Sequence, residues 1–158
     1  MNTFKTFCPK ISDAIQAMYD GLLDQDNRGS DYGIDMCHYV TQRHNVCFAC
    51  AATCAIQKAT GFTIEPNMIS IMKNSASTAD FKDDFELEFD ELADVEDALD
   101  GFRSGAPDCL LEYYEVDPDE IPEKLFEDME NIWLTTEEWR TEIQALPPII
   151  QALKEINL

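Results

Sequence analysis

Cysteine and histidine, the residue types that ligate zinc and carry thiol chemistry, gather in one short stretch of this sequence. Six of them lie within 18 residues: Cys37, His38, His44, Cys47, Cys50 and Cys54. Cys47 and Cys50 have the two-residue spacing that is common among zinc ligands. A tetrahedral site would combine these two with Cys37 or with a histidine such as His44.

Two features of this stretch argue against a metal site. The sequence has no second CxxC pair, and ligands three and seven residues apart on one helix point along one edge rather than around an ion. Cys50 and Cys54 stand among alanines, so they resemble small buried side chains that let helices approach closely. We therefore expect no metal and no cofactor. A metal-binding or thiol-based helical domain stays as an alternative.

A catalytic cysteine is a further alternative. Cys47, followed by Phe48 and Ala49 at a predicted helix start, resembles the nucleophile helix of papain-like enzymes. That resemblance implies a base histidine, and in such enzymes it usually follows the cysteine in the chain. Both histidines of this chain precede Cys47. Because no glycine-rich phosphate loop, GxSxG or HExxH motif is present either, the sequence predicts no enzyme.

Carboxylates are the second chemically notable group. The chain of 158 residues has 32 Asp and Glu against 11 Lys and Arg, a formal net charge of −21. Residues 80–142 hold 24 of these acids and only four basic residues, which leaves the rest of the chain almost neutral. Nucleic acids and anionic membranes bind proteins whose Lys and Arg replace their counterions, so we expect neither as a direct partner.

The charge is densest between residues 80 and 100, where eleven acids accompany one lysine. A helix of this length spans roughly 30 Å, which gives about one charge per ~3 Å. A nucleic-acid strand carries one charge per ~3.4 Å. Uncompensated like charges destabilise a helix, so a basic partner that supplies the missing cations would explain them.

The sequence therefore predicts an acidic interaction protein of the nucleic-acid mimic type. It would bind a basic nucleic-acid-binding protein and occlude the phosphate-binding surface of that protein. The predicted contact face consists of Asp83, Asp84, Glu86, Asp90, Glu91, Asp94 and Asp97, with a second patch at Glu127, Asp128 and Glu130. The plain alternative is an acidic helical protein whose charge serves only solubility.

Apolar spacing predicts the elements that would position these residues. Between residues 11 and 23, a helical stripe consists of Ile11, Ile15, Met18, Tyr19, Leu22 and Leu23. Residues 24–44 have the composition of a loop. We expect a central helix to begin at Asn45, as N-cap, and to end at Gly61. A short helix is predicted from Pro66 through Met72.

The acidic region also has an apolar stripe. It consists of Phe81, Phe85, Phe89, Leu92, Val95, Leu99 and Phe102. This spacing predicts one helix of about six turns, and a break or short strand near residues 85–90 is the competing interpretation. Further short helices are predicted to start near Pro107, Pro118 or Pro122, and Thr136. Pro147 and Pro148 should end the last of these. Tyr113, Tyr114, Trp133 and Trp139 fall at helical spacing, which is typical of core residues.

Together these patterns predict an all-α fold of six to eight helices with at most a small strand pair. We expect a single domain over residues 1–158. Its near-neutral half, 1–79, would build the core, its acidic helical half, 80–142, would display charge, and a terminal helix would cover 147–158. We expect a cytoplasmic location, because no signal peptide or transmembrane segment is visible. The stripe at 81–102 packs either on its own chain or on a second copy, which leaves a homodimer open.

Overall fold

The computed structural model describes residues 2–69 and 75–158, and it combines many helices with a four-stranded mixed sheet. The all-α prediction is therefore wrong. The helices are α1 (Phe4–Phe7), α2 (Ile11–Asn27), α3 (Ala51–Thr60), α4 (Lys82–Phe85), α5 (Phe89–Arg103), α6 (Pro107–Tyr113), α7 (Glu123–Glu130), α8 (Trp139–Glu142) and α9 (Leu146–Glu155). Single 3-10 turns cover Thr78–Phe81, Pro118–Glu120 and Ile143–Ala145.

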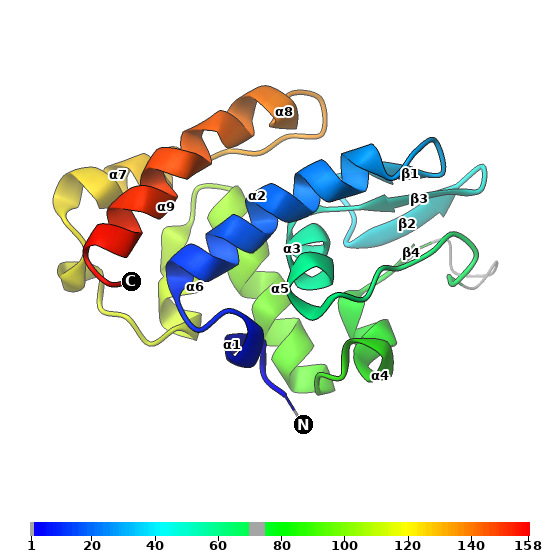
Figure 1. Ribbon diagram of the computed structural model, residues 1–158, viewed down its shortest axis with the longest axis horizontal. Coiled ribbons are helices and arrows are strands. Elements are labelled where there is room, and N and C mark those ends of the chain that lie inside the picture. The colour runs from blue at the N-terminus through cyan, green and yellow to red at the C-terminus, as the bar shows by residue number, and fades with distance from the viewer. Residues whose placement is uncertain (1, 70–74) are drawn as a thin grey trace.

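The sheet lies at one end of the molecule, beyond the C-terminal end of α2 (Figure 1). Its strands are β1 (Tyr32–Ile34), β2 (Val40–Arg43), β3 (Val46–Ala49) and β4 (Ser75–Ala76), arranged in the order β1-β3-β2-β4. β3 pairs in parallel with β1 and antiparallel with β2, and β4 pairs antiparallel with β2. Strands thus occupy the stretch that the sequence predicted to be a loop and the first turn of a helix.

A tight hairpin joins β2 to β3 at the position where the sequence predicted the start of a helix. His44 and Asn45 form the two-residue connection between β2 and β3, and their φ angles are 52° and 64°. A two-residue turn with both φ angles positive matches the right-handed twist of antiparallel strands. Asn45 is therefore a turn residue and not the predicted helix cap. The helix begins five residues later, after Cys50 as N-cap.

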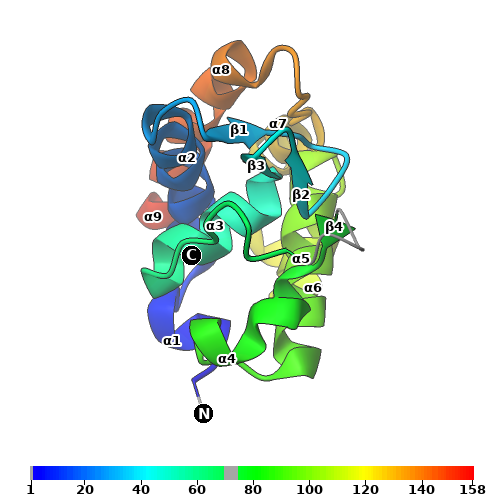
Figure 2. The same cartoon turned by 90° about the vertical axis from the view of Figure 1, so that its right-hand side faces the viewer.

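α3 is the central helix, with α2 on one side and α5 on the other (Figure 2). Its residues from Ala51 to Gln57 are all buried, and Gly61 ends it with a φ of 81°. A Cβ atom at Gly21 of α2 would overlap the carbonyl oxygen of Cys54. The close crossing of α2 and α3 therefore needs glycine on one helix and small side chains on the other, as the alanine-rich sequence predicted.

Two buried glutamines connect α2, α3 and the sheet. The Gln25 amide donates to the carbonyl oxygens of Gly33 and Cys47, at 3.0 and 3.4 Å. The Gln57 amide donates to Gln25 Oε1 at 3.2 Å, and the Ile64 N–H donates to Gln57 Oε1 at 2.9 Å. These hydrogen bonds position the sheet on α2 and α3, and they give the side chains of both buried glutamines their partners.

The predicted six-turn helix at 81–102 is broken. Glu86 ends α4 in the left-handed region, with φ at 59°, and Leu87 forms a single bridge with Asn2. α5 then starts at Phe89. The break confirms the competing interpretation, and it turns Phe89 outward, so that this side chain is 57% exposed instead of lying on the buried stripe. The other six residues of the stripe are buried.

The C-terminal part follows the predicted helices with two differences. Pro147 and Pro148 lie in the first turn of α9 and begin it, since N–H groups there need no helical partner. Trp133 is 57% exposed, whereas Trp139 is buried as expected. The helix predicted from Pro66 is absent as far as Ile69, where the chain forms a turn, and Met72 lies outside the described residues.

The buried residues form one cluster that runs from Phe4 to Leu153 and draws on both halves of the chain. Within residues 2–69 and 75–158, none of the helices is long and apolar enough to cross a membrane.

Candidate partner-binding surface

The predicted contact face is largely at the surface. Six of its members are exposed: Asp83, Asp84, Glu86, Asp90, Asp94 and Asp97. Of the second patch, Glu127 and Glu130 are exposed. Asp83 is close to Lys82, at 3.3 Å, but both side chains are open to solvent, where such a pair contributes little. These side chains are therefore accessible to a partner.

Two predicted contact residues are engaged within the chain. The Glu91 carboxylate is half-buried and accepts hydrogen bonds from the Phe4 N–H, at 2.7 Å, and from the Tyr113 hydroxyl. Burial and this bond to Glu91 raise the pKa of Tyr113 above its ordinary value. Asp128 pairs with Lys124 at 2.8 Å across one turn of α7. Glu91 thus joins α5 to α1 and α6, and its carboxylate already has its partners.

The exposed acids of α5 continue onto α6, which the sequence analysis did not include in the contact face. The two helices pack closely, because a Cβ at Gly101 would come within 2.6 Å of Cys109 Sγ. A groove of about 510 Å³ lies between them. Four carboxylates line it, those of Asp94, Asp97, Glu112 and Glu115. The sequence held a signal for the acids on this side, since Asp108 and Glu112 lie at helical spacing after Pro107, and Glu115 follows the end of α6.

Lys5 is the one basic side chain that lines this groove among the residues the structure describes. Its ammonium lies 4.9 Å from the ring centre of Tyr113 and 5.7 Å from that of Tyr114. A cation over an aromatic face is held by the ring quadrupole. One ammonium leaves most of the four carboxylates without a counter-charge, so the groove carries a net negative charge.

The candidate metal ligands of the sequence lie apart in the described part of the chain. Across residues 2–69 and 75–158, no group of three or more His, Cys, Asp or Glu side chains converges as metal ligands would. Burial raises the pKa of Cys47 and of Cys50 to about 11, and it also raises that of Cys54. Burial therefore favours the thiol form of these three side chains.

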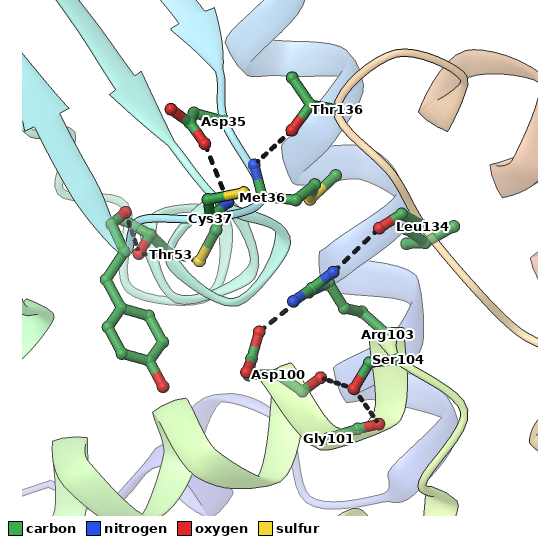
Figure 3. Close-up of polar contacts among 12 residues, drawn as sticks. Asp35, Met36, Cys37, Thr53, Asp100, Gly101, Arg103, Ser104, Leu134 and Thr136 are labelled. Atoms are coloured by element: carbon green, nitrogen blue, oxygen red, sulfur yellow. Dashed lines mark hydrogen bonds and ion pairs between the residues drawn. The ribbon is translucent and has the colours of Figure 1, made fainter.

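A second hollow, of about 390 Å³, lies between the loop after β1 and the C-terminal end of α5. Arg103 is held in its wall, because Nε donates to Asp100 at 2.9 Å and Nη1 donates to the Leu134 carbonyl at 3.0 Å (Figure 3). Cys50 and Trp133 also line it. The Cys50 thiol lies 3.6 Å from the Thr53 hydroxyl, whose own proton goes to the Tyr39 carbonyl. Nothing in the sequence predicted this hollow.

No family model matches the chain, and comparison with curated proteins and with solved structures also finds no match.

Proposed function

We propose that this protein is an acidic interaction protein that binds a basic nucleic-acid-binding protein and occludes its phosphate-binding surface. The observation that carries the proposal is the groove between α5 and α6, whose wall holds four carboxylates and a single lysine among the described residues. Competitive occlusion by such a surface would be fast and sensitive to salt, because long-range attraction steers the encounter.

The spacing of the acids supports this proposal. On α5, Asp90, Asp94 and Asp97 follow one another at steps of four and three residues. These steps advance about 6 and about 4.5 Å along a helix. Glu112 of α6 and Glu115, just beyond α6, add two more charges beside this row and bring the charge spacing toward the ~3.4 Å of one nucleic-acid strand.

The absence of internal pairing supports it as well. In the described part of the chain, Asp94, Asp97, Glu112 and Glu115 have no ion pair and no side-chain hydrogen bond. Crowded like charges reduce the stability of the fold. A surface serving solubility alone gains from interleaved Lys and Glu, which would remove that cost. Uncompensated acids around a groove favour a surface that acquires its cations from a partner.

A capture experiment tests the proposal. The immobilised protein is incubated with lysate at low salt, and bound proteins are then challenged with duplex DNA or with RNA. We expect a basic nucleic-acid-binding protein that the nucleic acid releases. The variant Asp94→Asn/Asp97→Asn/Glu112→Gln should lose this capture while keeping its fold.

The matched control, Asp20→Asn/Asp31→Asn/Glu155→Gln, loses the same charge at sites away from the groove and should keep the capture. A bound protein that resists nucleic acid, or that both variants retain equally, would contradict the proposal.

A further inference from the structure

Two large aromatic side chains lie open to solvent at the two ends of α5. Phe89 begins the helix, and Trp133 lies beside its last turn, because the Leu134 N–H donates to the Arg103 carbonyl at 2.9 Å. Each side chain is 57% exposed. Apolar groups of this size are costly to leave in water, and exposed aromatics are common anchors at protein interfaces.

Each of these aromatic side chains borders a hollow, and the two hollows share a wall. Phe89 lines a shallow one of about 530 Å³, and Trp133 lines the one of about 390 Å³ beside Arg103. Both are lined by the same three consecutive residues, Cys37, His38 and Tyr39. The two hollows therefore adjoin the same loop, Cys37–Tyr39, and the surface that they make together is here called the loop-37 groove. It is distinct from the groove between α5 and α6.

The charges at the Trp133 end of the loop-37 groove are net negative. Asp100 and Glu137 line it, and the one guanidinium there belongs to Arg103. That group is already neutralised by Asp100 and bonded to the Leu134 carbonyl, as Figure 3 shows. Glu137 is exposed and has no ion pair among the residues described. A cation entering this end meets an open indole and an unpaired carboxylate.

We propose that the loop-37 groove binds an extended, arginine-bearing segment of the basic partner, with an arginine on Trp133 and an apolar or second basic side chain on Phe89. The inference rests on the proposed function and adds where and how the partner is gripped. α5 has 15 residues and is roughly 22 Å long. A stretch of six or seven residues in extended conformation covers that distance.

Arginine fits this end better than lysine does. Its planar guanidinium stacks on an indole face while its N–H groups pair with a carboxylate in the same plane. The ammonium of lysine is a compact, strongly hydrated charge that gains less from an aromatic face. The groove should therefore distinguish two peptides of equal charge more strongly than exposed carboxylates alone would, and the excess should depend on Trp133.

Synthetic nona-arginine and nona-lysine peptides test this directly at low salt. Binding is measured by fluorescence anisotropy of the labelled peptide, and the tryptophan emission reports contact. Because Trp139 is only 2% exposed, a change in emission on peptide addition comes from Trp133. We expect nona-arginine to bind roughly threefold or more tightly than nona-lysine and to quench the emission.

Three variants sharpen the result. Trp133→Ala should weaken nona-arginine binding about threefold or more and abolish the preference for arginine, while Trp133→Phe should retain part of that preference. Phe89→Ala should weaken both peptides. Ile156→Ala, at an exposed apolar residue that caps the C-terminal end of α9, should change neither.

Equal binding of both peptides, with no effect of Trp133→Ala, would overturn the loop-37 groove as the contact. If Asp94→Asn/Asp97→Asn/Glu112→Gln still weakened binding in that case, the proposed function would stand and only this inference would fail. If neither peptide bound at all, both would fail.

Discussion

The two halves of the chain differ in the share of their acidic side chains that form ion pairs. In residues 1–79, the carboxylates of Asp24, Asp26 and Asp35 each pair with a cation, namely Lys58, Arg140 and Arg43, at 2.8, 2.5 and 2.8 Å. In residues 80–142, most carboxylates have no partner within the described chain, including those on the walls of the α5–α6 groove. In the described part of the chain, ion pairs are thus more frequent among the few acids of residues 1–79 than among the many acids of residues 80–142.

This difference separates the residues that stabilise the fold from those of the proposed contact surface. The N-terminal half contributes the crossing of α2 and α3 and the glutamine chain, which depend on close packing and complete hydrogen bonding. The C-terminal half buries the apolar faces of α5 to α9 but, in the described part of the chain, leaves most of its acidic side chains without an ion pair. Changes of the same chemical kind should therefore have different effects in the two halves.

The largest effect is expected at the helix crossing. Gly21→Ala places a methyl group against the backbone carbonyl of Cys54, so α2 or α3 must shift. We expect the free energy of unfolding to fall by about 3 kcal/mol. Gly101→Ala, in the acidic half, meets mainly the side chain of exposed Cys109, which can rotate, and should cost about 1 kcal/mol. Urea denaturation of both variants measures the contrast, and equal losses would contradict it.

Charge neutralisation should change stability in opposite directions. Asp94→Asn/Asp97→Asn/Glu112→Gln/Glu115→Gln removes mutual repulsion and should raise the free energy of unfolding by about 1 kcal/mol at low ionic strength. Asp24→Asn removes the partner of Lys58 and should lower it by about 0.5 kcal/mol. Both effects should shrink in 1 M salt, where the screening length is about 3 Å. A loss of stability in the quadruple variant would show that those carboxylates support the fold.

Glu96 and Asp35 should contribute to the pH dependence of stability in opposite directions. Burial raises the pKa of Glu96 above its ordinary value, despite hydrogen bonds from Thr78, so protonation stabilises the fold. Thermal stability should therefore rise as the pH falls from 7 toward about 4.5.

Burial of Asp35 is outweighed by Arg43, the Cys37 N–H and His38, which hold its pKa below the ordinary value. That contribution is present above about pH 4 and is lost as the pH falls through the lowered pKa.

Thermal melting from pH 7 to below pH 4 measures both contributions, and we expect the melting temperature to shift by a few degrees. Glu96→Gln should remove much of the rise, and Asp35→Asn should remove part of the acid loss. A midpoint that increases steadily from pH 4.5 to 7 would contradict the assignment to Glu96.

The smallest effect is expected at Arg140. Its guanidinium pairs with Asp26 of α2 and lies 4.9 Å from the Trp139 ring centre, but the side chain is mostly open to solvent. Arg140→Met retains the stem and removes the charge, and it should leave the urea midpoint almost unchanged. A clear fall in the midpoint would show that this link between α2 and α8 contributes more than an exposed pair can.

The helical part of the fold follows from apolar spacing, and the sheet does not. Ile11, Ile15, Met18 and Leu22 are buried along α2 as predicted, because a period of 3.6 residues leaves few alternatives. The strands β2 and β3 are four residues long, and the β3 sequence continues without a break into the alanine-rich helix. Apolar spacing cannot show where the strand ends and the helix begins in such a run. The only local signal of the strands was the His44-Asn45 turn.

The candidate surface was partly predictable for a similar reason. Composition alone placed the acids at the surface of the C-terminal half, since unpaired carboxylates are rarely buried. It could not show that Glu91 bonds the Phe4 N–H, nor that α6 supplies the opposite wall of the groove, because both depend on tertiary packing. The outward turn of Phe89 likewise follows from the break at Glu86, which apolar spacing alone did not resolve.

The most direct test of the central claim is a displacement titration. The basic protein recovered by capture is first bound to a labelled DNA duplex or RNA strand. The acidic protein is then added at increasing concentration, and the titration is repeated at several salt concentrations. We expect the nucleic acid to be released, less so as salt increases and not at all with Asp94→Asn/Asp97→Asn/Glu112→Gln. Nucleic acid that stays bound while this protein also binds would place the contact away from the phosphate-binding surface and would contradict the claim.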